Sequence, residues 1–470
     1  MASDDLSYVC LLAFSICFGP VLKRTVGYRN KQLLSSGVGL IIVVLWCRQN
    51  VLHSLVAAFI NSLIIKFVSP KSCHWISFAW CFGYLAFFRT TSYFGLPAIQ
   101  PLANAVQLIL TLKLIGLAFE VHATYKNKQA ASVTSDGNTV DLQNSYQNID
   151  PSIADMMCYS YCYIGLFTGP YYKFRTYVDM LNQQRDIPNL KDLMVARLKR
   201  LPLYIAAFFI VSHYFTIQYV QTEEFSTRSF WLRMFYMSPI FFVFRMRFYC
   251  AWILAECMCM TAGLGAYPVA SQPRCGKGPT DYLALQLSED ESPERVMYDF
   301  ETVRNIQEYD CEFAPSVREG LRSWNTTVQY WLASNVYRHL PVNSSALKVA
   351  MTMGVSAYWH GIHPGYYLSF LTVPPTMMVN EMFAARFRDG QSPRQQKLFD
   401  WLCWFFKMRV FEYMCMGFLL LSFEATVGYW SSVYFMWHIW LGLMLVAGTL
   451  LASTRTRVGQ EGAGAQQKID

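Results

Sequence analysis

Charged residues are scarce in this sequence. Asp, Glu, Lys and Arg make up 15% of its 470 residues, whereas an average soluble domain carries about 25%. The sequence also has no Walker loop, no glycine-rich dinucleotide fingerprint and no serine-centred nucleophile elbow. No internal repeat of fixed period is visible, which argues against a transporter built from repeats. These absences argue against a soluble, nucleotide-dependent or serine-hydrolase protein.

The first apolar run lacks the marks of a removable signal peptide. The segment Met1–Asp5 has no basic residue, and no small-residue cleavage site follows the run. The 14 cysteines are scattered, many of them in apolar runs, and none has the spacing of zinc ligands. We therefore expect the first run to remain in the protein. We expect the cysteines to pack as small apolar side chains.

Long apolar runs dominate what is present. Hydrophobic residues make up 54% of the chain and aromatic residues 16%. Several runs approach the roughly 20 residues that cross a bilayer as a helix, and shorter runs are candidates for re-entrant or interfacial helices. The sequence predicts an all-α polytopic membrane protein with roughly 9–11 transmembrane helices. The candidate spans are 6–22, 33–47, 51–68, 75–95, 98–121, 153–172, 201–222, 229–255, 346–362, 365–385, 410–423 and 430–452.

Basic residues give the orientation of these spans. They cluster in residues 173–200, in residues 386–409 and after residue 452, which the positive-inside rule places in the cytosol. The span 346–362 then runs from the cytosol towards the lumen. Counting all six early spans as crossings would place the basic residues of 23–32 in the lumen. We therefore expect one early span to be re-entrant or merged with a neighbouring span, and the sequence does not say which.

Two polar stretches interrupt the apolar pattern. Residues 122–152 are rich in Asn, Gln, Ser and Asp, and residues 271–318 carry Pro, Gly and a dense acidic run. We expect both stretches to lie outside the membrane. The predicted organisation is one multi-pass domain over residues 1–452, followed by a flexible cytosolic tail over residues 453–470.

His360 lies inside an apolar, aromatic segment, residues 356–370. An ionisable group at membrane depth is costly, so this histidine is a functional candidate, although it could instead bond a carbonyl of a neighbouring helix. His363 follows three residues later, but no nearby Cys, Asp or Glu completes a metal site. We therefore expect no metal, and we expect His363 to mark the end of the helix before Pro364.

An amphipathic helix is expected over residues 319–332. Trp324, Val328 and Trp331 recur at helical spacing and would share one face, which is typical of an interfacial helix. Asn325 lies beside that face. This arrangement can bring Asn325 and His360 towards one cavity from opposite ends.

Trp324-Asn325, followed by Trp359-His360-Gly361, resembles the signature pair of the membrane-bound O-acyltransferase (MBOAT) family. Further segments resemble its lysophospholipid acyltransferase branch, and in particular the enzymes that act on lysophosphatidylinositol. The resemblance covers about residues 6 to 450 and fades in the polar loops and in the tail. The further segments are residues 88–89, 93–97, 104–108, 159–163, 168–170, 244–249, 265–269, 301–306 and 413–418.

The resemblance implies a multi-helix bundle around an internal chamber, embedded in the endoplasmic reticulum membrane. It also implies transfer of a polyunsaturated acyl chain, such as arachidonoyl, from acyl-CoA to the free hydroxyl of lysophosphatidylinositol. His360 would be the general base and Asn325 the oxyanion or positioning donor. Acyl-CoA is then a co-substrate, and no bound cofactor and no nucleic-acid partner are expected. The oligomeric state is left open.

The CoA phosphates would favour cationic side chains, and Arg318 and Arg322 are candidates for that contact. Positive-inside topology explains the same residues without a ligand. We expect direct transfer in a ternary complex, because no nucleophile for an acyl-enzyme stands out. Two alternatives to the predicted function stay open: another lysophospholipid acceptor, or a catalytically silent lipid-binding scaffold.

Overall fold

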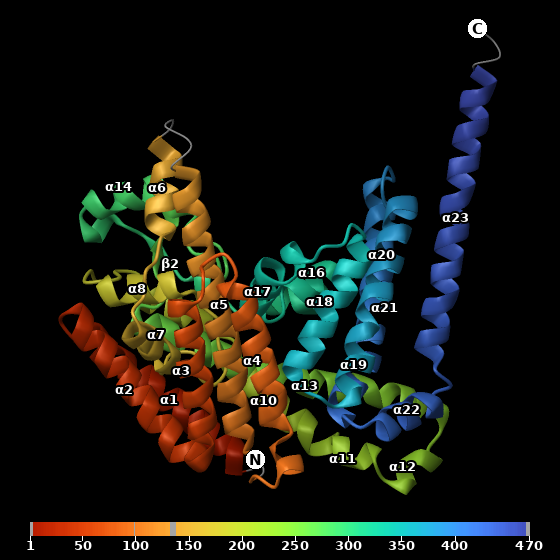
Figure 1. Cartoon of the computed structure of the whole chain (residues 1–470). Helices are drawn as coiled ribbons and strands as arrows, with labels where there is room; N and C mark the ends of the chain where they lie inside the picture. Colours follow the sequence, from red (N-terminus) through yellow and green to blue (C-terminus); the bar gives the residue numbers. More distant parts are fainter. Residues whose placement is uncertain (1–2, 98, 132–137, 467–470) are drawn as a thin grey trace. The chain divides into compact units, whose positions relative to one another are not determined.

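The computed structural model describes residues 3–97, 99–131 and 138–466. The chain divides into two compact units. The first unit comprises Met1–Ile205, Arg247–Ile306 and Asn325–His339, and the second comprises Ala206–Met246, Gln307–Trp324 and Leu340–Asp470. Helices predominate among the described residues, in agreement with the predicted all-α class (Figure 1).

Five long helices form one side of the first unit. Figure 1 shows them in red to orange, and successive helices contact one another. Short connections reverse the chain: the α1–α2 connection is Thr25–Gly27, with Gly27 at φ 90°, and the α2–α3 connection starts at Arg48, with φ 47°. The helices are α1 (Ser3–Arg24), α2 (Tyr28–Cys47), α3 (Val51–Phe67), α4 (Cys73–Arg89) and α5 (Pro101–Ala131).

The span expected over residues 153–172 does not form a membrane-crossing helix. Its helical part, α7 (Ile153–Tyr161), has nine residues, and such a helix is about 14 Å long, half the thickness of the hydrocarbon core. Residues 162–173 are irregular and mostly buried, and α7 packs on α2 and α3. The segment is apolar because the protein covers it.

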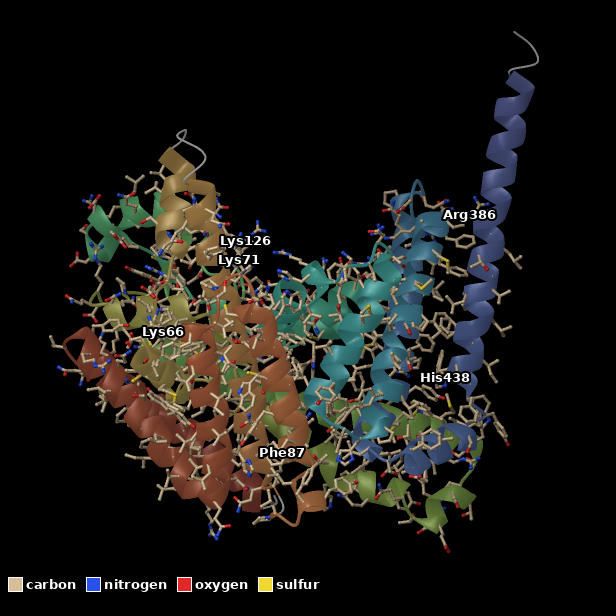
Figure 2. All side chains as sticks on the ribbon, viewed as in Figure 1. Lys66, Lys71, Phe87, Lys126, Arg386 and His438 are labelled. Carbon is tan, nitrogen blue, oxygen red and sulfur yellow. The ribbon has the colours of Figure 1, made fainter. Side chains whose placement is uncertain are left out.

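The orientation of the early helices stays a prediction, and leaving this span out of the count is consistent with it. If each of α1–α5 counts as one crossing, the α1–α2 connection falls on the same side as the basic stretch 173–200. Lys66, Lys71 and Lys126 fall on that side as well, and Figure 2 shows them towards one end of α3, the α3–α4 turn and α5. The positive-inside rule assigns this end to the cytosol.

The remaining elements of the first unit are short. The helix α5 continues into the stretch expected as a polar loop, and α6 forms a further part of that stretch. The two strands β1 and β2 pair antiparallel, Tyr267 with Asp299 and Pro268 with Tyr298. The elements are α6 (Asn138–Gln147), α8 (Phe174–Asn182), α9 (Leu190–Leu198), β1 (Tyr267–Pro268), α14 (Tyr282–Asp290), β2 (Tyr298–Asp299), α17 (Thr326–Asn335) and the 3₁₀ turns η1 (Arg48–Asn50), η2 (Thr91–Phe94), η3 (Val269–Ser271), η4 (Pro293–Arg295), η5 (Glu301–Val303) and η6 (Tyr337–His339).

The second unit is a helical bundle in which α19 contacts α18, α20, α21 and α22. The span expected over 365–385 is broken between Leu371 and Val373, and the span over 430–452 bends by 76° between α22 and α23. Figure 2 labels Arg386 on α20 and His438 near the start of α23. The helices are α11 (Ile217–Val220), α12 (Glu223–Thr227), α15 (Glu308–Phe313), α16 (Val317–Arg322), α18 (Ser345–His360), α19 (Pro364–Leu371), α20 (Val373–Phe387), α21 (Pro393–Leu420), α22 (Phe423–Ser432) and α23 (Met436–Gln466).

Two helices, α10 (Leu201–Tyr214) and α13 (Phe230–Ala262), contribute residues to both units. The helix α23 reaches Gln466, and residues 467–470 of the predicted tail lie outside the described residues. The flexibility of that tail stays a prediction.

Helices long and apolar enough to cross a membrane occur in the first unit, and the second unit has one bent helix pair that passes the same test when its two helices are taken together. By length and composition, three helical stretches of the described residues qualify: Ser7–Arg24, Tyr28–Phe67 and Pro101–Ala130. The stretch Tyr28–Phe67 contains both α2 and α3. The described residues have four such candidate spans if the bent pair α22–α23 counts as one. The chain therefore has the apolar helices of a polytopic membrane protein, and the expected 9–11 crossings stay a prediction.

Candidate active site

His360 is the last residue of α18, in the second unit. The helix starts at the Ser344 cap, whose hydroxyl accepts from Leu347 N–H at 3.3 Å, and the helix ends where Gly361 takes an extended conformation. His363 is the N-cap residue of α19, so His360 and His363 do not share one helix. The expectation that His363 ends the His360 helix is wrong by three residues, because the chain leaves the helix at Gly361.

Aromatic rings surround the His360 imidazole. Phe370 stacks on it at a centroid distance of 5.2 Å, and Phe418 meets it edge-on at 5.1 Å. Tyr366 lies at 5.9 Å and Trp359 at 4.7 Å. These rings come from α18, α19 and α21, and they pack around the imidazole, which stays partly exposed at the end of its helix.

Glycine allows α19 and α21 to approach closely enough to bring these rings together. A Cβ on Gly365 would lie 2.2 Å from the Gly417 carbonyl oxygen, far inside contact distance. The Gly365 N–H donates to Leu421 O at 2.7 Å, and the Ser369 hydroxyl donates to Met414 O at 2.7 Å. The Gly365–Gly417 contact therefore fixes the spacing between Phe370 on α19 and Phe418 on α21.

A row of aromatic contacts links this surround to Trp324 within the second unit. Phe418 contacts Phe244 at 5.6 Å, and Phe244 stacks on Trp324 at 5.9 Å with an interplanar angle of 17°. The sequence analysis included Phe244 and Phe418 only within segments that resemble the family, and Phe370 only within residues 356–370. No signal marked the three as neighbours of His360 or Trp324, because the chain has 34 Phe residues and most of them serve packing.

Asn325 belongs to the first unit. It is the N-cap residue of α17 and has φ 49° and ψ 50°, a left-handed conformation that Asn tolerates better than most residues. Its carbonyl accepts from the N–H groups of Val328 and Gln329, both at 3.0 Å. The backbone at Asn325 is therefore fixed by the first turn of α17.

The expected amphipathic helix over residues 319–332 is wrong, because the chain is not helical between α16 and α17. The helix α16 ends at Arg322, and Thr326 N–H bonds to Asn305 O at 2.9 Å, a partner outside the helix. Trp331 is fully buried and donates to Leu112 O at 3.0 Å, so it is a core residue and not an interfacial anchor.

A buried polar network holds the residues that follow Asn325. The Thr327 hydroxyl donates to Asn305 Oδ1 at 2.6 Å and accepts from Tyr171 N–H at 3.0 Å. Glu256 Oε1 accepts from Asn305 N–H at 2.7 Å, and Arg197 Nε donates to Glu256 Oε2 at 2.5 Å. Glu256 lies at the end of an apolar run, which was a usable sequence signal that the predictions missed.

The predicted site residues fall in different units. His360, Arg318 and Arg322 belong to the second unit, and Asn325 belongs to the first. The convergence of Asn325 and His360 on one cavity, and the internal chamber, stay predictions. Arg318 pairs with Glu381, Nε to Oε1 at 3.0 Å, whereas Arg322 is exposed.

The cysteines of the region between α13 and α17 are not activated. Burial raises the pKa of the Cys275 thiol to about 12, and burial likewise raises the pKa of the Cys311 thiol to about 12. Neither would be a thiolate near neutral pH, and the thiolate is the nucleophilic form. Over residues 3–97, 99–131 and 138–466, no group of three or more His, Cys, Asp and Glu is arranged to hold a metal ion.

Comparison with known proteins adds to this geometry. A family model described as the membrane-bound O-acyltransferase (MBOAT) family matches residues 88–420. The chain is 44% identical over 456 residues to a membrane-bound acylglycerophosphatidylinositol O-acyltransferase of Xenopus laevis, covering 96% of this chain and 95% of the relative. It is 43% identical to the human protein of that name, and the match covers 100% of this chain and 99% of the human one. It is 34% identical to the Drosophila melanogaster protein, and that match covers 97% of this chain and 94% of the relative.

Proposed function

The chain belongs to the membrane-bound O-acyltransferase family, and we propose that it is an acyltransferase acting on lysophosphatidylinositol. The proposed donor is acyl-CoA with a polyunsaturated chain such as arachidonoyl. The product would be remodelled phosphatidylinositol, and the proposed location is the endoplasmic reticulum membrane. The observation that carries the proposal is the similarity to the human and Xenopus relatives over nearly the full length of each chain.

His360 is the proposed general base. A hydroxyl is a poor nucleophile near neutral pH, so a base must remove its proton as it attacks the thioester carbonyl. The new bond joins the acceptor oxygen to the acyl carbon, the bond between that carbon and sulfur breaks, and CoA leaves as a thiol with the proton from His360. The aromatic surround of Tyr366, Phe370 and Phe418 supports this role, because its rings limit the orientations that the imidazole can take.

Asn325 is the proposed donor to the oxyanion or the residue that positions the acyl group. One preorganised donor of this kind is worth about 2.7–4 kcal/mol in the transition state. The left-handed turn and the Thr327–Asn305 hydrogen bond support the role, since they fix the backbone that carries the amide. Direct transfer without an acyl-enzyme is also proposed, and the raised pKa values of Cys275 and Cys311 are consistent with it.

Arg322 is the better of the two arginines proposed for the CoA phosphates. Arg318 already pairs with Glu381, whereas Arg322 is exposed on the same short helix, α16. Cationic side chains form strong charge-assisted hydrogen bonds with phosphate.

The test is an acceptor panel. Membranes that contain the chain would receive arachidonoyl-CoA and one of five lysophospholipids, with inositol, choline, ethanolamine, serine or plain phosphate as the headgroup. We expect conversion of lysophosphatidylinositol above all others, and none in membranes without the chain. Conversion of another headgroup would change the acceptor and keep the family. No conversion by a folded, monodisperse protein would favour the silent scaffold.

A further inference from the structure

A cleft of about 590 Å³ lies in the first unit, where the α1–α2 connection meets the segment between α8 and α9. Its size falls in the range of about 300–1,000 Å³ that is usual for small-molecule sites. Three cationic side chains line it, Lys23, Arg24 and Lys31, and the one carboxylate in its lining is Asp186. None of these residues belongs to the proposed acyl-transfer site.

Lys31 is the most buried of the three cations. It is only 5% exposed, and its Nζ donates to the Gln183 carbonyl oxygen at 2.5 Å. Among the residues that the structure describes, Lys31 forms no ion pair. A buried ammonium is costly unless an anion compensates it, and a neutral carbonyl does not supply the missing charge.

The other two cations are not neutralised well either. Lys23 pairs with Asp186 at 3.2 Å, but the Asp186 side chain is 95% exposed, and exposed ion pairs contribute little. Arg24 is exposed and pairs with no carboxylate in the described part of the chain. The cleft therefore keeps an excess of positive charge.

The rest of the lining suits a ligand with hydroxyl groups at a membrane boundary. Asn182, Gln184 and Tyr28 offer amide and hydroxyl groups that can donate and accept hydrogen bonds. The cleft opens where the apolar helix α1 ends and α2 begins, and Val26 in its lining is 83% exposed. Basic pockets between membrane helices on the cytosolic side are typical binding sites for anionic headgroups.

We propose that this cleft binds the headgroup of an anionic phospholipid of the inositol type. Arg24 and Lys31 contact the phosphate, and Asn182 and Gln184 contact the ring hydroxyls. Neither His360 nor Asn325 is among its lining residues, so the proposed binding adds a lipid-binding function to the proposed acyl transfer and does not depend on turnover.

Photolabelling of the full-length chain in lipid nanodiscs tests the proposal, because it reports where a lipid binds. The probe is a phosphatidylinositol with a diazirine in its headgroup, and the labelled peptides are identified by mass spectrometry. Competitors are dioctanoyl phosphatidylinositol, dioctanoyl phosphatidylcholine and inorganic phosphate. The variants are Arg24→Gln and Lys31→Gln. Lys71→Gln is the matched control, since Lys71 is an exposed cation in the α3–α4 turn of the same unit (Figure 2).

We expect label in residues 20–31 or 182–190, suppressed by phosphatidylinositol and not by phosphatidylcholine. Loss of one charge-assisted hydrogen bond should lower the labelling roughly tenfold in Arg24→Gln and Lys31→Gln, and Lys71→Gln should label like the wild type. Label absent from both segments, or unchanged in Arg24→Gln, would overturn the proposal. Equal competition by inorganic phosphate would identify a free-phosphate site and overturn the lipid headgroup. Acyl transfer is measured on the same nanodiscs, so its absence would count against the proposed function and leave the labelling result standing.

Discussion

The Thr327 hydroxyl donates to Asn305 Oδ1 at 2.6 Å, and both residues are fully buried in the first unit. Thr327 follows Asn325 by two residues in the first turn of α17. This hydrogen bond joins that turn to Asn305, whose N–H is held by Glu256. The backbone of Asn325 is therefore set by residues that are distant from it in the sequence.

Replacing Thr327 with Val is expected to lower kcat and stability together. Asn305 Oδ1 loses its shorter donor and keeps only the Thr327 N–H at 3.4 Å, and Tyr171 N–H loses its acceptor. One buried unpaired group of this kind costs about 1–3 kcal/mol. The measurement is the acyl-transfer rate beside the apparent melting temperature of the purified protein. Thr327→Ser keeps the hydroxyl and serves as the control. Equal activity of Thr327→Val and Thr327→Ser would show that the network does not position Asn325.

Gly365→Ala is expected to separate α19 from α21. Its Cβ would lie 2.2 Å from Gly417 O, so the helices must move apart, and overpacking of this kind typically costs about 1–3 kcal/mol. The control is Gly354→Ala on α18, where a Cβ meets nothing within 4 Å. That change should be neutral or stabilising, by about 0.4–1 kcal/mol, because alanine favours helix. The measurement is the melting temperature of each variant. A Gly365→Ala protein as stable as the Gly354→Ala protein would contradict the close packing of α19 on α21.

Arg245 and Arg318 of the second unit are expected to differ in what their substitution by Gln costs in stability. The Arg245 side chain is 7% exposed and bonds to Glu312 at 2.7 Å, so Arg245→Gln leaves a largely buried carboxylate without its partner and should cost about 3–5 kcal/mol. The Arg318–Glu381 pair is exposed, and its loss should cost about 0–1 kcal/mol. The melting temperatures of the Arg245→Gln and Arg318→Gln proteins make the comparison.

The KM for acyl-CoA should be near normal in Arg318→Gln and raised in Arg322→Gln, and the reverse order would exchange the roles proposed for Arg318 and Arg322.

Asp299 on β2 is expected to make stability depend on pH. Burial raises its pKa to about 6, although a hydrogen bond from Glu301 N–H opposes the shift. Between about pH 4, its value when unfolded, and pH 6, the folded protein binds more protons, so stability falls as the pH rises through that window. Asp299→Asn should melt at a higher temperature than the wild type above pH 6 and at nearly the same temperature near pH 4. A difference that does not change with pH would rule out the ionisation of Asp299 as its cause.

The sequence was sufficient to predict helices that local apolar patterning determines. The helix α18, at Ser345–His360, lies within two residues of the span predicted over 346–362, because its apolar run is bounded by polar residues and a glycine. The same patterning misread residues 153–172, which are apolar because the protein buries them.

Long-range contacts were beyond the reach of the sequence. Helical spacing predicted one helix over 319–332, yet the chain breaks at Asn325, because Thr326 and Thr327 bond to Asn305 instead of continuing a helix. Three of the aromatic neighbours of His360 come from α19 and α21, and the close packing of these two helices at Gly365 and Gly417 brings the rings together. Periodicity contains no information about such contacts.

The most direct test of the account compares His360→Ala with His363→Ala in the transfer of arachidonoyl from CoA to lysophosphatidylinositol. Both substitutions remove an imidazole, and the two residues lie three positions apart, one at the end of α18 and one at the cap of α19. Removing a general base should lower kcat by about 10²–10⁴-fold in His360→Ala, whereas His363→Ala should keep most of the activity. A folded His360→Ala protein that transfers the acyl chain at the wild-type rate would contradict the role of His360 as the base.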